Sequence, residues 1–183
     1  MASLYDDDLQ TEVTQDTLRI ARILSNGIHT YDLPTTKPVD FTQIFPGPFD
    51  DARTLDMLSI ATVHREEASE SFTYSNATPD PRNVVNALKR YFPDVWCLTE
   101  SMRRAGAAGN IRLNMKGSLL FQWSSVVDNA SRSNMWSNKT FVYEIIMVLA
   151  HYGLLHSNVA SNQAAAGDHV TASKTLRQGA GIL

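Results

Sequence analysis

The spacing of apolar residues predicts two helices in the first part of the chain. Within 51–74 and within 81–104, apolar side chains recur three and four positions apart, which is the periodicity of one helix face. An aspartate that can accept hydrogen bonds from the first turn precedes each segment, at Asp50 or Asp51 and at Asp80. The last turns of the first helix carry an acidic surface made by Glu66, Glu67 and Glu70.

The last third of the chain predicts a strand and two more helices. Residues 111–123 alternate apolar and polar side chains and end in an aromatic pair, as half-buried strands do. After a polar loop at 129–138, the segment 139–162 is apolar around most of its circumference, and such a helix must be buried on most sides. A last helix opens at Asp168 and continues to the end of the sequence without a capping signal.

The first 48 residues predict an extended arm. Four prolines forbid a long helix after position 33, namely Pro34, Pro38, Pro46 and Pro48. We expect this arm, 1–48, to pair with 111–123 in a small antiparallel β-sheet near the N-terminal part. The helices and that strand occupy 50–183. The predicted fold is therefore mainly α, with antiparallel helical layers and one small sheet, in a single domain over 1–183.

Composition indicates a globular protein with an uneven charge. Hydrophobic residues make up 43% of the chain and charged residues 19%, a balance that supports a packed core. Residues 1–100 carry 16 acidic and 8 basic side chains, a net charge of −8, whereas 101–183 carry 3 and 8, a net of +5. The halves can neutralise each other across the fold, or the basic half can contact an acidic partner or a membrane surface. The total of −3 argues against nucleic-acid binding.

The start of the chain and its longest apolar run give no sign of secretion or membrane insertion. The first residues are acidic and lack the apolar core of a signal peptide. The longest apolar run, Ile145–Ala150, is far shorter than the roughly 18 residues that span a bilayer. We therefore expect a cytoplasmic location.

No catalytic or cofactor motif is recognisable, and we expect no enzyme activity and no cofactor. The single cysteine, Cys97, stands between Trp96 and Leu98 in a helical pattern, which predicts a buried thiol rather than a nucleophile. Gly179 and Gly181 stand within a helical segment, where close helix packing is their expected role.

The histidines of the last third do not form a metal motif. His151 and His156 are five residues apart and therefore lie on different faces of a helix. Adding Asp168 and His169 gives no ligand spacing typical of zinc, so we expect no metal.

We first interpret two sets of residues in the last third, one polar and one aromatic, as structural. Glu144, His151 and Asn158 follow one another at intervals of seven and form a polar seam on an apolar helix. We interpret this seam as an inter-helix hydrogen-bond line, with a ligand site as the alternative. Phe121 and Trp123 are expected to hold the strand onto the helices, with base stacking as the alternative.

These elements together resemble the Bro-one-like domain family, the ALIX-type adaptors of endosomal sorting, with the plant members closest. The resemblance rests on the aromatic strand Phe121–Gln122–Trp123–Ser124–Ser125, and on the helix that begins with Tyr143 and Glu144 and continues through Gly153. It also rests on the following segment, Ala172 to Leu183. The match covers about 119–183.

The resemblance implies a curved, helical-repeat-like body that binds and does not catalyse. The family partner is the C-terminal amphipathic helix of an ESCRT-III subunit, held in a groove, with peripheral contact to endosomal membranes during multivesicular-body formation. Asp168 corresponds to an acidic contact residue of the family, and its competing role is to cap a helix. Since the family domain is about twice this length, the resemblance also implies a partial domain whose uncovered apolar surface makes the chain sticky or dimeric.

Two other functions stay open at this point. One is an unrelated helical interaction module, which a repeat of roughly 34 to 45 residues would indicate, although no such repeat is visible. The other is a small enzyme that uses Cys97 with a histidine.

Overall fold

The protein is mainly helical, as predicted. A computed structural model describes residues 27–32, 34–45, 52–72, 80–108, 119–124 and 135–183, and it describes 105–108 by backbone alone. These residues contain five helices and one two-stranded antiparallel sheet. The bounds of the elements are α2 Phe41–Ile44, α3 Ala52–Ser71, α4 Pro81–Ala108, β1 Phe121–Ser124, β2 Met135–Asn138, α5 Phe141–Ala165 and α6 His169–Ala180.

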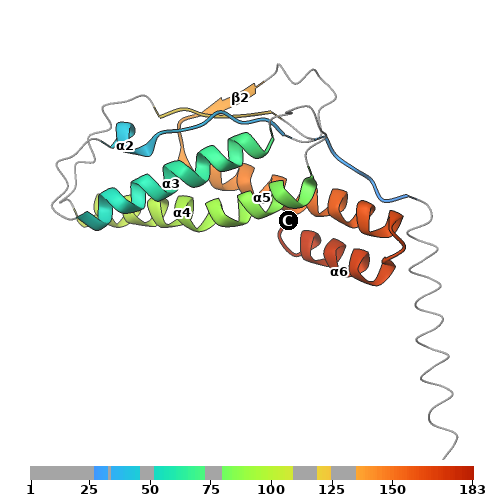
Figure 1. Ribbon diagram of the computed structural model, residues 1–183. Coiled ribbons are helices and arrows are strands. Elements are labelled where there is room, and N and C mark those ends of the chain that lie inside the picture. The colour runs from blue at the N-terminus through green and yellow to red at the C-terminus, as the bar shows by residue number, and fades with distance from the viewer. Residues whose placement is uncertain (1–26, 33, 46–51, 73–79, 109–118, 125–134) are drawn as a thin grey trace, which may run out of the picture.

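The helices form one body, and the extended segments lie along one side of it. Helix α3 packs on α4, α4 packs on α5, and α5 packs on α6. The extended arm and the two strands run together along one edge of this helical layer, while α6 lies at one end (Figure 1). The strand β1 and the arm therefore reach α3 and α5 at the same place, where the core is most densely aromatic.

Helix α4 follows the predicted periodicity throughout, whereas α3 follows it only from Leu58 onward. In α4 the buried positions recur at intervals of three or four, at Val84, Leu88, Tyr91, Val95 and Leu98. The helix continues through Pro93 and extends four residues beyond the expected end at Arg104. The predicted caps of α3, Asp50 and Asp51, lie outside the described residues.

Helices α5 and α6 are adjacent and antiparallel, as the resemblance implies. Thr140 caps α5, where its side chain accepts a hydrogen bond from the backbone N–H of Tyr143 at 3.2 Å. A short turn then reverses the chain at Gly167, whose φ of 83° favours glycine. The two helices meet through Ala160 and Ala172, both without solvent exposure.

Glycine permits the closest approach of α5 and α6. A Cβ atom on Gly179 would lie 2.7 Å from the Cβ of His156 and 2.8 Å from the carbonyl oxygen of Gly153. Close packing is therefore confirmed as the role of Gly179. It is wrong for Gly181, because a Cβ atom there would meet only the backbone oxygens of its own last turn, at 3.5 and 3.6 Å.

The sheet differs from the prediction in its second strand. β1 pairs in antiparallel register with β2, so that Trp123 lies opposite Trp136. The expectation of a polar loop over 129–138 is wrong for its last residues, which form β2. This strand has no buried position, so it lacks the alternation that would reveal it. The strand expected over 111–123 begins only at Phe121 within the described residues, and 111–118 lies outside them.

The arm joins the same sheet through a single bridge. Thr36 is bridged to Trp123, and the backbone N–H of Ser124 donates to the carbonyl of Thr35 at 2.9 Å. The expected pairing of arm and aromatic strand is thus present, although it is short. The extended arm over 1–48 is interrupted by α2, which Asp40 caps by accepting from the backbone N–H groups of Thr42 and Gln43.

Helix α2 places phenylalanines against the aromatic strand. Phe41 is fully buried, with its ring centroid 6.4 Å from that of Phe121 and 6.1 Å from that of Phe141. The rings of Phe121 and Phe141 meet edge to face at 5.2 Å. This contact anchors the start of β1 to the start of α5, so the aromatic strand is held onto the helices as predicted.

Candidate functional site

A buried ion pair lies where the strand, the arm and three helices meet. The Nε of Arg65 on α3 is 3.2 Å from Oε1 of Glu144 on α5, and neither side chain has any solvent exposure. A pair of this kind stabilises a fold only when its remaining polar atoms are also bonded. Trp123 and Thr36 each form a hydrogen bond with the pair, and the guanidinium of Arg65 lies over the Tyr91 ring, 5.5 Å from its centroid. Among the described residues, Nη1 of Arg65 and the hydroxyl of Tyr91 have no hydrogen-bond partner. We call the five residues the Arg65 cluster.

Trp123 and Thr36 connect the ion pair to the extended segments. The indole Nε1–H of Trp123 donates to Oε2 of Glu144 at 2.6 Å. The guanidinium of Arg65 donates to Oγ1 of Thr36 at 2.5 Å, and that hydroxyl donates to the carbonyl of Gln122 at 2.7 Å. Arg65 also lies over the Trp123 ring, 4.8 Å from its centroid. The cluster therefore joins β1 and the arm to α3 and α5.

The electrostatics of the cluster fit a structural role. Burial raises the pKa of Glu144, and the contacts to Arg65, Trp123 and Tyr91 oppose that rise. Burial, together with the Glu144 carboxylate, raises the pKa of Tyr91 well above its usual value. All five residues are buried, so the cluster lies in the core rather than at the surface.

The polar seam of α5 is buried, and most of its partners are extended segments rather than helices. Glu144 reaches Arg65 on α3, as an inter-helix line requires. His151 donates from Nδ1 to the carbonyl of Met147 at 2.6 Å and stacks on Trp123. Asn158 accepts from the backbone N–H of Tyr31 at 2.8 Å and donates to its carbonyl at 2.7 Å. The seam thus holds β1 and the arm, which corrects the expectation of a purely inter-helix line.

The five residues that carry the family resemblance occupy two places. Trp123, Glu144 and Phe121 belong to the core at the sheet, where Trp123 and Glu144 are in direct contact. Tyr143 donates its hydroxyl to the carbonyl of Trp136 at 3.0 Å and so ties β2 to the start of α5. Gly153 lies away from them, at the contact with α6.

The prediction that Cys97 is buried is wrong, because its side chain is exposed. Tyr91, Val95 and Leu98 define the buried face of α4, and positions 96 and 97 fall on the opposite side of a helix of 3.6 residues per turn. Trp96 is accordingly half exposed. Extending the predicted stripe by one turn would have found this.

The histidines of α5 point to separate partners. His151 lies against Trp123, whereas His156 donates from Nδ1 to the carbonyl of Tyr152 at 2.6 Å and packs near Gly179. In the described parts of the chain, no three His, Cys, Asp or Glu side chains gather as a metal site would require.

Asp168 caps α6. Its carboxylate accepts from the backbone N–H of Thr171 at 3.0 Å. Hydrogen bonds from the side chain and then the backbone of Thr171 lower the pKa of Asp168 below its usual value. The residue is exposed, so a partner can reach it.

One face of α5 is apolar and exposed over its first two turns. Val142 and Ile146 are 60% and 57% exposed, and Gly153 follows on the same face at a spacing of 11 residues from Val142, which is three helical turns. Helix α6 covers this face at Gly153. We call Val142 and Ile146 the open α5 face.

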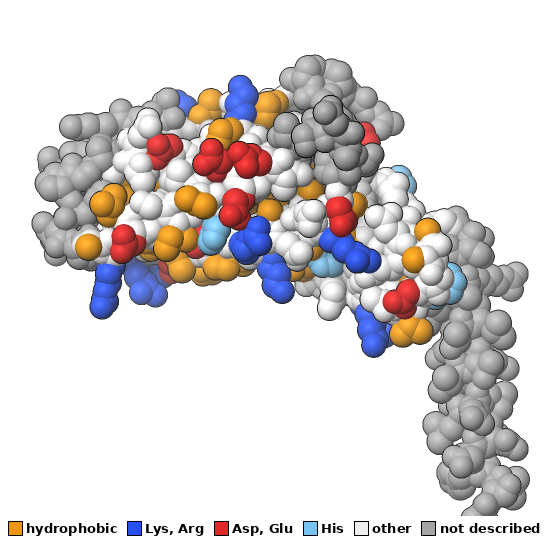
Figure 2. Space-filling model, viewed as in Figure 1, with side chains coloured by type: hydrophobic (Ala, Val, Ile, Leu, Met, Phe, Trp, Pro, Cys, Tyr) orange, Lys and Arg blue, Asp and Glu red, His pale blue; other side chains and the backbone are white. Residues whose placement is uncertain are grey.

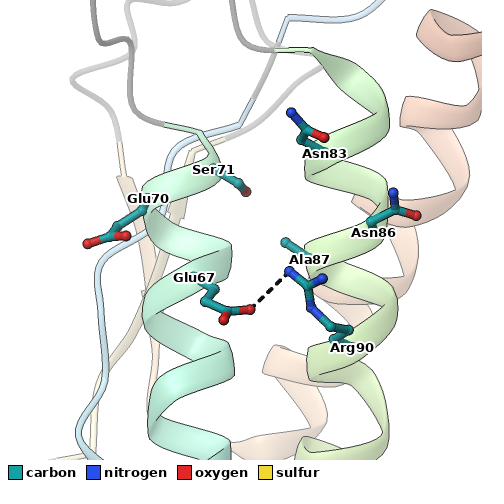
Figure 3. Close-up of a pocket in the computed structure, with 7 residues that line it drawn as sticks. All are labelled: Glu67, Glu70, Ser71, Asn83, Asn86, Ala87 and Arg90. Atoms are coloured by element: carbon teal, nitrogen blue, oxygen red, sulfur yellow. Dashed lines mark ion pairs between the residues drawn. The ribbon is translucent and has the colours of Figure 1, made fainter.

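A polar hollow of about 380 Å³ lies between α3 and α4. Its lining consists of Glu67, Glu70, Ser71, Asn83, Asn86, Ala87 and Arg90. The guanidinium of Arg90 reaches across to Glu67 at 3.0 Å, whereas Glu70 points away from the gap (Figure 3). The hollow is open to solvent and spanned by this ion pair, so it is not an enclosed ligand pocket.

Two of the four ion pairs among the described residues join the acidic first half to the basic second half. Glu100–Arg103 joins near neighbours on α4. Arg65–Glu144 pairs a cation of the acidic half with an anion of the basic half, so it leaves the imbalance unchanged. Figure 2 shows acidic side chains gathered over the part of the surface formed by α3. Most of the imbalance of charge therefore lies on the surface.

Comparison with known proteins gives no relative. No family model, no curated protein and no solved structure matches the chain. Among the described helices, none combines the length and the apolar character that crossing a bilayer requires.

Proposed function

We propose that this protein is a non-enzymatic adaptor of endosomal sorting, of the Bro-one-like kind, that binds an amphipathic helix of an ESCRT-III subunit. The observation that carries the proposal is the open α5 face. Val142 and Ile146 are apolar, exposed and one turn apart, as anchors for a partner helix are.

The position of α6 supports a helix as the occupant. Helix α6 runs antiparallel to α5 and lies on the same face of it, and Leu183 contacts the position of Gly153. A partner helix on the open α5 face would lie on α5 as α6 does, one to three turns nearer to its N-terminus. It would bury Val142 and Ile146 against its own apolar side chains, and that burial would drive binding.

The Arg65 cluster supports this function indirectly. It fixes the first two turns of α5 to α3 and β1 through Glu144, which stands between Val142 and Ile146 in the sequence. A face held rigidly before binding loses little conformational entropy on binding.

A titration with a synthetic peptide tests the proposal. Fluorescence anisotropy would follow a labelled C-terminal helix of an ESCRT-III subunit, with a sequence-scrambled peptide as the reference. We expect Val142→Asp combined with Ile146→Asp to weaken binding at least tenfold, because charges replace the buried anchors. Val170→Asp on α6, at an equally exposed apolar position, is the matched control and should bind like wild type.

Asp168 can be tested separately from its cap. Asp168→Asn retains a good capping side chain but removes the charge. Weaker peptide binding with unchanged thermal stability would support a partner contact at Asp168. If wild type binds the scrambled peptide as tightly as the native one, or if the aspartates at 142 and 146 have no effect, the proposed function is wrong.

A further inference from the structure

The outer side of α3 is apolar in its middle and acidic toward its end. Ile60 and Val63 are 49% and 52% exposed, and Glu66, Glu67 and Glu70 follow within two turns on the same side of the helix. We call these five residues the α3 face. In Figure 1 this helix runs along the front of the helical layer, between the arm and α4.

The carboxylates of the α3 face are in an unfavourable local setting. They lie near the C-terminal end of α3, where the helix dipole is negative, and the last turn contains no basic residue. Arg90 pairs with Glu67, but neither Glu66 nor Glu70 forms an ion pair with any described residue. A positively charged partner would relieve this repulsion, so the charge indicates what the surface binds.

Helix α6 presents the complementary surface. Val170 is 61% exposed, and Lys174 and Arg177 are exposed on the same side, four and seven residues later. We call these three residues the α6 face. Neither cation forms an ion pair with a described residue, and basic and hydrophobic side chains lie beside each other at the α6 end of the molecule (Figure 2).

The two faces match in spacing as well as in charge. Val63, Glu67 and Glu70 are separated by four and then three residues, as are Val170, Lys174 and Arg177. With the helices parallel and the valines opposed, both charged pairs fall at equal heights, about 6 Å and about 10.5 Å along the axis. Glu66 lies one turn after Val63 and can replace Glu67 opposite the lysine.

We propose that the α3 face of one molecule binds the α6 face of a second copy of this chain. The two surfaces are different, so the contact is head-to-tail and leaves a free face on each molecule for the next copy. The contact is weak and salt-sensitive, because its charges are exposed and its apolar part is small. This self-association goes beyond the proposed function, and its contact uses no residue of the open α5 face.

Sedimentation velocity of the full chain tests the proposal. At low ionic strength the weight-average sedimentation coefficient should increase with protein concentration, and high salt should return it to the monomer value. Glu66→Lys with Glu70→Lys, and separately Lys174→Glu with Arg177→Glu, should each weaken self-association about tenfold or more. Arg82→Glu with Lys89→Glu, exposed on α4, matches the second change in charge and should associate like wild type.

Mixing the two variants provides the decisive measurement. The variant with Glu66→Lys and Glu70→Lys presents a basic α3 face and a basic α6 face. The variant with Lys174→Glu and Arg177→Glu presents an acidic α3 face and an acidic α6 face. Each alone should remain monomeric, and an equimolar mixture should regain association. Since all four substituted side chains are exposed, circular dichroism should show that both variants are folded.

Three results would overturn the proposal. The first is a wild-type chain that stays monomeric at every concentration at low ionic strength. The second is a mixture that associates no better than its components. The third is loss of self-association in the Val142→Asp, Ile146→Asp variant, which would place the contact on the open α5 face. Peptide binding that fails in wild type while self-association persists would refute the proposed function alone.

Discussion

Trp123 donates its indole hydrogen to the Glu144 carboxylate at 2.6 Å, and the two residues come from a four-residue strand and from the first turn of a long helix. The other oxygen of Glu144 faces Arg65. One hydrogen bond therefore links the aromatic strand to the ion pair that crosses the helical layer. The stability of the sheet thus depends on the charge state of the core.

Breaking the ion pair from one side should be costly. Arg65→Met or Glu144→Gln leaves a buried charge without its partner, and we expect each to lower the free energy of unfolding by about 3–5 kcal/mol. The double variant, Arg65→Met with Glu144→Gln, should lose less than the sum of the two. Urea denaturation measures all three, and simple additivity would show that the two residues do not interact.

Removing the indole donor should have a smaller effect. Trp123→Phe keeps an aromatic ring in the core but leaves Oε2 of Glu144 without its hydrogen bond, at a cost of about 1–3 kcal/mol. Trp136→Phe, at the exposed tryptophan opposite Trp123 on β2, serves as the control and should change stability by less than about 0.5 kcal/mol. Equal effects of the two substitutions would contradict the role assigned to Trp123.

His151 should make the protein less stable in mild acid. Burial lowers the pKa of His151 from 6.5 to about 4, so a proton binds the unfolded chain more readily than the folded one. Its contribution to stability is complete above about pH 6.5 and is lost as the pH falls toward 4, by an amount on the order of 3 kcal/mol. Burial raises the pKa of Glu144, which acts in the opposite sense. The test is therefore the difference between wild type and His151→Gln, measured by denaturation at several pH values. A difference that does not vary with pH would contradict the prediction.

Substituting Gly179 and Gly181 by alanine should lower the stability of the protein to different degrees. Gly179→Ala places a methyl group 2.8 Å from the carbonyl of Gly153, and we expect a net loss of about 1–3 kcal/mol in spite of the better helix propensity of alanine. Gly181→Ala meets nothing closer than 3.5 Å and should be nearly neutral. Thermal melts of the two variants make the comparison, and a neutral Gly179→Ala would exclude tight contact of the two helices.

Asn158 should control the attachment of the arm. Asn158→Ala removes both hydrogen bonds to Tyr31, together worth roughly 1–3 kcal/mol. Because Tyr31 is partly exposed, water can replace them, and the arm should open locally while the helices stay folded. Limited chymotrypsin digestion should cut after Tyr31 about tenfold faster than in wild type. The control is Asn162→Ala, at an exposed position one turn later on α5. Chymotrypsin should cut this variant after Tyr31 at the wild-type rate.

Periodicity predicted the long helices well because their burial follows a single repeating face. In α4, Val84, Leu88 and Tyr91 are buried as expected. Helix α3 fits less well, since its first apolar positions, Ala52 and Leu55, are exposed and its buried face includes Arg65. A buried arginine cannot be read from an apolar pattern, because its burial depends on a carboxylate that lies 79 positions later, at Glu144.

The short elements could not be predicted from periodicity, for a related reason. Helix α2 and strand β2 have four residues each, too few to show a repeat. β2 is identified by its hydrogen bonds to β1, and α2 by the capping of Asp40. In the polar seam, the spacing of seven correctly placed Glu144, His151 and Asn158 on one line. It could not identify their partners, since Tyr31 and Trp123 reach that line only through the fold.

The two hydrogen bonds between Asn158 and Tyr31 also set an order of events during synthesis. The arm leaves the ribosome early, but its partner lies 127 residues later in the chain. At about 5–20 residues per second, the arm waits roughly 6–25 seconds before Asn158 exists. For the first 90 residues of that interval, until Phe121 is made, the edge formed by Thr35 and Thr36 has neither β1 nor α5 to bind. The nascent chain is therefore most open to chaperones, or to pairing with another copy, before β1 and α5 are made.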